Sequence, residues 1–191
     1  MTDRLPRMTP GCMNPAQRRV YDHILASRQT TGLSPFPLCR TDGSLTGPFN
    51  VMAVAPVVGA PLSALGAALR SDTSLSPRAR EFAILTVAAW LGSEYEWESH
   101  SAVARSIGVS EAELSGIRGG SGPRVSDEHE AAVVGVVRAV LERADLSDTE
   151  YEDAVSTLGC ETLVELVVLV GYYELLGRLL TTFRANSSGD S

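Results

Sequence analysis

Residues 78–100 read RAREFAILTVAAWLGSEYEWESH, and this stretch decides the fold of the chain. Up to Leu91 the stretch is mostly apolar, and Glu81 is the only ionisable residue between Arg80 and Glu94. A segment that is apolar on nearly every side predicts a buried central helix. A carboxylate in that position needs a partner or a changed pKa, because an isolated buried charge is costly.

A second helix is expected directly after the first, because Gly92 interrupts the apolar run and Ser93 can cap a new helix. On it Ser93, Glu96 and His100 are spaced i, i+3 and i+7, which places them on one face. A hydroxyl, a carboxylate and an imidazole beside Glu81 are able to transfer protons. Taken alone, the spacing also fits a histidine packed beneath a helix, a surface Glu–His pair, and a glutamate that only ties two helices together.

These residues resemble the motif of the carboxymuconolactone decarboxylase family, which shares its fold with the alkylhydroperoxidase D proteins. In the redox members a glutamate is followed by a CxxC pair and then by a histidine. Glu81, Ser93, Glu96 and His100 fall on those four positions, so the glutamate and the histidine are kept and both cysteines are replaced. The resemblance implies an all-α, alkylhydroperoxidase D-like helical bundle without the CxxC redox pair.

The likeness covers roughly residues 15–185. GPFNVM at 47–52 is similar to the family's entry to its first core helix, and LVGYYELLGRLLTTF at 169–183 is similar to its last helix. We therefore expect one helical domain over 15–185, preceded by an N-terminal arm at 1–14 and followed by a C-terminal tail at 186–191.

No part of the chain shows the alternating pattern of a β-strand over a useful length. Cap residues mark the expected helix starts. Pro15 and Pro77 suit the first position of a helix, Ser110 with Glu113 forms a capping box, and Ser126 and Ser147 are N-cap candidates. A long loop is expected over 31–48. The expected helices cover 15–28, 51–58, 62–70, 77–91, 93–107, 110–116, 126–143, 147–159 and 161–183.

The uncharged stretch 43–69 has two possible interpretations, a membrane span or buried helical elements. Its prolines, glycines and alanines make it too weakly hydrophobic and too often broken for a spanning helix. We expect two buried, proline-punctuated elements and no membrane partner.

Four residues outside the Glu81–His100 constellation are candidates for substrate binding. Arg78 and Arg80 flank the start of the first helix, where the helix macrodipole disfavours basic residues, so one of them is a candidate clamp for a carboxylate. Their alternative role is that of solvated first-turn residues. Phe49 and Asn50 follow the long loop and are candidates for the mouth of a pocket.

Three residues of the second helix complete the candidates for substrate binding: Ser93, Tyr95 and Trp97. The resemblance places Ser93 at a family cysteine position, and the two aromatic residues neighbour the Glu96–His100 face. Tyr95, Trp97 and also Trp90 are alternatively residues of the core, which is the more common place for large aromatic side chains.

Composition excludes several classes. A net charge of −7 without a basic cluster argues against nucleic-acid binding. Three scattered cysteines indicate reduced thiols, and the N-terminus lacks the apolar core of a signal peptide, so a cytoplasmic location is expected. Three widely spaced histidines without a cysteine pair predict no metal site, and the glycines form no phosphate-binding pattern.

The resemblance implies a lyase that decarboxylates a carboxylated lactone without a cofactor, since the substrate's own carbonyl accepts the electrons. His100 is then the proton donor, Glu96 its orienting partner, and Glu81 a second acid/base or tuning group. The same groups suit an isomerase or a retro-aldol tailoring enzyme of secondary metabolism. The alternative of another class is a non-catalytic protein that binds a small ligand. In either case apolar stretches at 51–69 and 162–183 predict a homo-oligomer, a dimer or trimer.

Overall fold

The computed structural model describes residues 3–28 and 37–185, and within them it contains nine α-helices and no strand beyond one isolated bridge, between Cys39 and Leu45. The predicted all-α class is therefore confirmed. The predicted tail at 186–191, and the part of the predicted loop at 31–36, lie outside the described residues. The helices are α1 (Pro15–Arg28), α2 (Gly47–Val54), α3 (Pro56–Ser71), α4 (Pro77–Leu91), α5 (Glu94–Ser106), α6 (Glu111–Arg118), α7 (Glu128–Arg143), α8 (Asp148–Leu158) and α9 (Cys160–Phe183).

Most of the predicted helix starts are confirmed. Ser76 accepts a hydrogen bond from the N–H of Ala79 at the start of α4. The capping box of Ser110 and Glu113 is complete at the start of α6. The prediction for Ser126 is wrong by one residue, because the carboxylate of Asp127 accepts from the N–H of Glu130 and starts α7. Aspartate and serine are both good N-caps, so the adjacent pair gave two possible starts.

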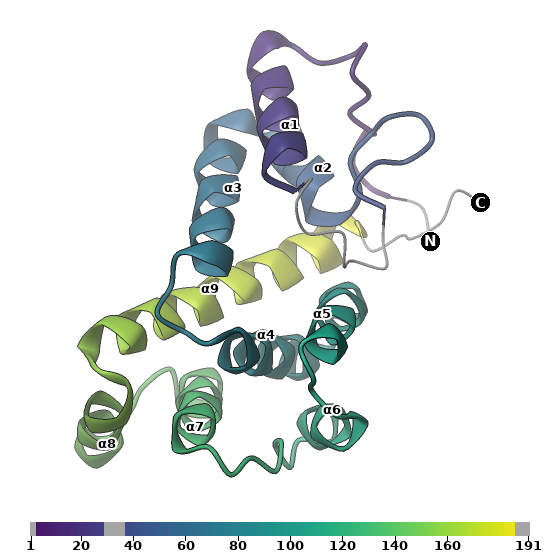
Figure 1. Cartoon of the computed structure of the whole chain (residues 1–191). Coiled ribbons are helices and arrows are strands. Elements are labelled where there is room, and N and C mark those ends of the chain that lie inside the picture. The colour runs from purple at the N-terminus through teal and green to yellow at the C-terminus, as the bar shows by residue number, and fades with distance from the viewer. Residues whose placement is uncertain (1–2, 29–36, 186–191) are drawn as a thin grey trace. The chain divides into compact units, whose positions relative to one another are not determined.

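The described residues form two compact units, which we describe separately. The first comprises residues 3–71 and 176–185, and in it α1 packs against α2 and α3 (Figure 1). The predicted borders at 51–58 and 62–70 are wrong, because the break between the two helices falls at Ala55 and α3 continues through Pro61. A Cβ at Gly59 would lie 2.0 Å from the carbonyl oxygen of Met52, so glycine permits the close approach of the two helices.

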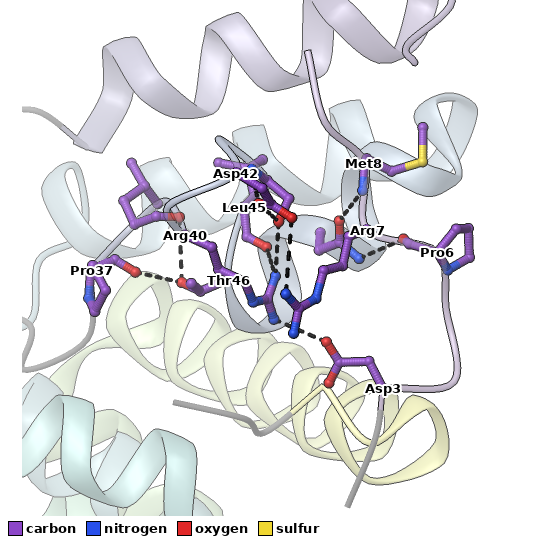
Figure 2. Close-up of polar contacts among 12 residues, drawn as sticks. Asp3, Pro6, Arg7, Met8, Pro37, Arg40, Asp42, Leu45 and Thr46 are labelled. Carbon is purple, nitrogen blue, oxygen red and sulfur yellow. Dashed lines mark hydrogen bonds and ion pairs between the residues drawn. The ribbon is translucent and has the colours of Figure 1, made fainter. Parts of the chain in front are cut away.

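The N-terminal arm is docked within the first unit, as Figure 2 shows. Asn50 is 3% exposed; its Oδ1 accepts from the N–H of Met8 and its Nδ2 donates to the carbonyl of Pro6. Arg40 pairs with Asp3 at 3.1 Å. The prediction that Asn50 lines a pocket mouth is therefore corrected, because both polar atoms of its amide hold the arm.

The second unit comprises residues 72–175, and α4 is its central helix, packed against α5, α6 and α7 (Figure 1). Phe82, Leu85 and Val87 on α4 are fully buried, as predicted for the apolar run. Trp90 is the exception, with an exposed fraction of 55%, so its expected place in the core is wrong. It lies in the last turn of α4, directly before the chain turns away at Gly92.

Among the described residues no single helix has both the length and the hydropathy to cross a membrane. Only α8 and α9 taken together, a pair bent by 112°, meet that measure of length and composition. The uncharged stretch 43–69 forms α2 and α3.

Candidate active site

A tight turn joins α4 to α5. Gly92 ends α4 in the left-handed conformation with φ +63°, which glycine adopts without strain. The N–H of Ser93 donates back to the carbonyl of Ala88 at 2.9 Å. The chain therefore reverses within two residues, and the buried side of α4 that carries Glu81 faces α5.

The structure brings Glu81, Glu96 and His100 together. Nδ1 of His100 lies 2.7 Å from Oε2 of Glu81, and Nε2 lies 3.6 Å from Oε2 of Glu96. The side chains of the two glutamates are only 6% and 5% exposed, and that of His100 is 14% exposed. The imidazole thus lies between two buried carboxylates, one on each helix. The spacing of the residues predicted this convergence, while their catalytic roles stay a prediction.

A fourth group, Tyr173 of α9, was missed by the sequence analysis. Its hydroxyl lies 3.3 Å from Nε2 of His100, and the two rings meet edge to face with centroids 5.2 Å apart. Tyr172 packs edge to face on Tyr173 in turn. Tyr173 lies 73 positions beyond His100 in an apolar helix, where a tyrosine reads as core, so only the folded chain places it here.

The contacts assign different tasks to the two ring nitrogens. An ionised carboxylate only accepts hydrogen bonds, so Nδ1 carries the proton that faces Glu81. In the neutral ring Nε2 is then the acceptor, and the hydroxyl of Tyr173 donates to it. In the protonated ring Nε2 carries a proton toward Glu96. Nε2 therefore faces a hydroxyl, that of Tyr173, and a carboxylate, that of Glu96.

The expectation that Ser93 caps α5 through its side chain is wrong. Ser93 occupies the N-cap position, but its side chain makes no capping hydrogen bond. The hydroxyl is buried and has no hydrogen-bond partner among the residues that the structure describes. Its predicted role in substrate binding is untouched by this correction.

The prediction that Arg78 is a clamp for a substrate carboxylate is corrected by its contacts. The guanidinium donates to Glu113 at 2.8 Å, to Glu130 at 2.9 Å and to the carbonyl of Gly108 at 3.0 Å. Its carbon atom lies 5.2 Å from the centroid of the Phe82 ring. Arg78 thus ties α4 to α6 and α7, and each of its three side-chain nitrogens already donates to another residue.

Trp97 also belongs to the structure of the unit. It is 9% exposed, in a cluster with Phe82 and Leu85, and the guanidinium of Arg118 lies 4.9 Å from its ring centroid. Arg118 in turn holds Glu94 at 2.6 Å. The predicted contact of Trp97 with substrate is therefore replaced by a place in the core.

The remaining candidates keep their predicted roles as predictions. Tyr95 is buried on α5, and Arg80 is half-buried in the first turn of α4. Phe49 lies in the first unit, half-buried on α2. Within residues 3–28 and 37–185 no group of three or more histidines, cysteines or acidic residues is placed to hold a metal ion.

Comparisons with known proteins bear on the family and the fold of the chain. Residues 56–139, a little under half of the chain, match the model of the carboxymuconolactone decarboxylase family. Over these residues the chain is similar to that family. No match was found among curated protein sequences.

Solved structures show the same fold at low identity. An uncharacterized peroxidase-related protein from Ralstonia eutropha with an alkylhydroperoxidase AhpD core is 14% identical, with a TM-score of 0.77 over 98% of this chain and 93% of that one. A protein of unknown function from Agrobacterium tumefaciens, named after the antioxidant defence protein AhpD, is 23% identical, with a TM-score of 0.62 over 71% and 93%. The debrominase Bmp8 bound to 2,3,4-tribromopyrrole is 13% identical, with a TM-score of 0.69 over 96% and 91%. The predicted alkylhydroperoxidase D-like fold is therefore confirmed.

Proposed function

We propose that this protein is a cofactor-independent lyase of the decarboxylase type, acting on a small oxygenated carboxylic acid or lactone. The observation that carries the proposal is the imidazole of His100 between the buried carboxylates of Glu81 and Glu96. A histidine held at a fixed tautomer is suited to general acid–base catalysis near neutral pH.

The proposed reaction needs one proton and no external electrons. The bond between the substrate carbon and its carboxylate breaks, and carbon dioxide leaves. The electron pair of that bond moves into the unsaturated carbonyl system and forms an enolate. Nε2 of His100 then donates its proton to carbon, the carbonyl is restored, and water returns a proton to the ring.

The neighbours of His100 have separate parts in this scheme. Glu81 accepts a hydrogen bond from Nδ1 at a distance of 2.7 Å, so it fixes the orientation of the ring and stabilises the imidazolium. Glu96 lies one helical turn from His100, and its carboxylate attracts the proton on Nε2. The hydroxyl of Tyr173 donates to Nε2 once the proton has left, so the neutral ring keeps its orientation.

The substrate carboxylate needs a cation, and of the two predicted arginines only Arg80 remains a candidate. Arg78 is held by two glutamates and a backbone carbonyl. Arg80 makes no ion pair with another of the described residues. Replacing Arg80 by methionine is expected to raise KM for an acidic substrate more than it lowers kcat.

Thiol chemistry is not part of the proposal, because Ser93 and Glu96 stand at the two cysteine positions of the redox members. We expect no turnover of hydroperoxides with a dithiol donor. The three cysteines Cys12, Cys39 and Cys160 are free, and none lies on α5. Hydroperoxide reduction by the wild-type chain, whether or not it survives replacement of these three residues by serine, would contradict the expectation.

The proposal is tested by following the proton. A panel of carboxylated unsaturated lactones and β-keto acids is incubated with the protein in D₂O, and carbon dioxide release is measured beside the NMR spectrum of the product. We expect deuterium on the carbon that lost the carboxylate, as a single stereoisomer, because one fixed imidazole delivers it. A racemic product, or no turnover across the panel, contradicts the proposal.

The predicted homo-oligomer, which suits a lyase and a non-catalytic ligand-binding protein alike, is supported by the surface of α9. Val164, Val167, Val168 and Leu175 are each at least 40% exposed, and their spacing puts them on one face of the helix. Such an apolar stripe supports the predicted homo-oligomer. Light scattering is expected to give a dimer or trimer for the wild type and a smaller species for Val164→Glu; a wild-type monomer at micromolar concentration contradicts it.

A further inference from the structure

Three described helices begin with the pattern Ser-x-x-Glu, but only two of them use it as a capping box. At α6 and α8 the serine side chain accepts from the third N–H, and the glutamate accepts from the serine N–H. At α5 the side chain of Ser93 makes no such bond, and the carboxylate of Glu96 lies instead at 3.6 Å from His100. The same local sequence therefore has another use at α5.

The turn before α5 explains why the box is absent. A capping box needs the serine N–H for the glutamate, but the N–H of Ser93 already donates to the carbonyl of Ala88 in the preceding helix. The backbone of Ser93 has ψ 93°, whereas Ser110 and Ser147 have 157° and 160°. With this backbone conformation the side chain of Ser93 makes no capping hydrogen bond.

The cost of this arrangement is a buried hydroxyl without a partner. Ser93 is 8% exposed, and its Oγ makes no hydrogen bond with any part of the chain that the structure describes. A buried polar group left unpaired destabilises the folded state, so such groups are uncommon and call for an explanation. One explanation is a ligand atom that pairs with the Ser93 hydroxyl when the ligand binds. Burial strengthens such a hydrogen bond by excluding water.

The surroundings decide which ligand atom fits. The N-terminus of a helix carries partial positive charge and favours an electron-rich oxygen. The carboxylates of Glu81 and Glu96 disfavour a full negative charge nearby. We propose that the Ser93 hydroxyl, at the N-terminus of α5, binds the carbonyl oxygen of a neutral lactone or ketone group of the substrate. This assignment rests on the proposed function, in which that oxygen gains charge only during the reaction.

The test uses γ-butyrolactone as a neutral probe and acetate as a charged one, titrated by NMR against the full chain. Three proteins are compared: the wild type, Ser93→Ala and Ser101→Ala. Ser101 is the matched control, because its hydroxyl is also buried and also lacks a partner among the described residues, but it lies inside α5. We expect the lactone to bind the wild type more tightly than acetate does, and Ser93→Ala to weaken lactone binding about 2- to 10-fold, the worth of one neutral hydrogen bond. Ser101→Ala is expected to bind as the wild type does.

Thermal unfolding separates this role from capping. Ser110→Ala and Ser147→Ala remove real caps and are expected to lower Tm by about 2–4 °C each. Ser93→Ala is expected to leave Tm unchanged or raise it. A fall in Tm equal to that of the other two, absent binding to the wild type, or equal binding by wild type and Ser93→Ala overturns the proposal. So does a loss in Ser101→Ala as large as that in Ser93→Ala. Lactone binding that depends on Ser93 in a protein without turnover refutes the proposed function and leaves this site standing.

Discussion

Two basic side chains of the second unit, Arg78 and His100, each lie between two carboxylates, and they differ in whether the side chain can also be neutral. Arg78 lies between Glu113 and Glu130, with hydrogen bonds of 2.8 and 2.9 Å. Its side chain is 31% exposed. The hydrogen bonds from Arg78 to Glu130 and Glu113 raise the pKa of the guanidinium further above its ordinary value. Arg78 is charged at every relevant pH, so this arrangement can only hold helices together.

His100 lies between Glu81 and Glu96 with less exposure, and its ring can carry one proton or two. The two sites share α4, on which Arg78 and Glu81 stand three residues apart. The difference teaches that paired carboxylates around a cation do not by themselves mark an active site. The His100 arrangement adds two features that the Arg78 arrangement lacks: an imidazole in place of a guanidinium, and the hydroxyl of Tyr173 at Nε2.

The largest expected effect is on the His100 arrangement. His100→Ala is expected to lower kcat/KM on the true substrate by about 10²–10⁴, the usual worth of a positioned general acid or base. The fold should persist, because the ring lies at the margin of the core with 14% exposure. Steady-state kinetics and circular dichroism measure the two quantities. His129→Ala, on an exposed position of α7, is the matched control and should leave the rate unchanged; equal rates for both variants would remove the catalytic reading of His100.

The next effect sharpens the role of the tyrosine. Tyr173→Phe keeps the ring that packs on His100 but removes the hydroxyl at 3.3 Å from Nε2. We expect kcat to fall about 2- to 10-fold, since one hydrogen bond to a neutral group is worth about 0.5–1.5 kcal/mol. The pH–rate profile should also move, because the hydroxyl stabilises the neutral ring. Tyr151→Phe, with an exposed ring on α8, is the control. A lower rate with an unmoved pH profile would make Tyr173 only a packing residue.

The sequence predicted the part of this site that depends on the spacing of residues along one helix and on the turn that follows α4. Glu96 and His100 lie on one face of α5 because they are four positions apart, and Gly92 indicated the turn that brings Glu81 to them. It could not reach Tyr173, because no local pattern links positions 73 residues apart. The same limit explains the wrong reading of Arg78, whose partners lie 35 and 52 positions away.

The caps show the same boundary between local and distant causes. Ser76, Ser110 and Ser147 were predictable because an N-cap bond spans three residues. Ser93 has an equally good local pattern, but the end of the preceding helix takes its N–H through Ala88. Local sequence predicts a cap, and the neighbouring helix decides whether it forms.

The Arg78 arrangement is tested through stability. Arg78→Met removes the bonds to Glu113 and Glu130 and leaves two largely buried carboxylates without their cation. We expect the free energy of unfolding to fall by about 2 kcal/mol, less than for a fully buried pair because the guanidinium is partly exposed. Urea denaturation measures it. Activity of the folded variant should match that of the wild type; a rise in KM at unchanged stability would restore the reading of Arg78 as a substrate clamp.

The smallest expected effect concerns the exposed ion pair between Arg143 and Glu150. Unlike the Arg78 and His100 arrangements, this pair is not buried and contains no histidine. The N–H and hydroxyl of Ser147, and then Arg143, lower the pKa of Glu150 from its ordinary 4.5 to about 2. A carboxyl whose folded pKa is depressed stabilises the fold above the unfolded pKa, and that stabilisation is lost as the pH falls toward the folded value. Glu150→Gln is therefore expected to lose a small amount of stability at pH 7 and to show a flatter decline between about pH 5 and pH 2. Urea midpoints across that range give the slope. Glu152→Gln removes an exposed carboxylate of the same helix and serves as the control, with the slope of the wild type. If the stability of both variants falls with pH in parallel with that of the wild type, the capping box of α8 does not contribute to acid sensitivity. The Ser-x-x-Glu pattern would then differ between α8 and α5 in geometry but not in its contribution to stability.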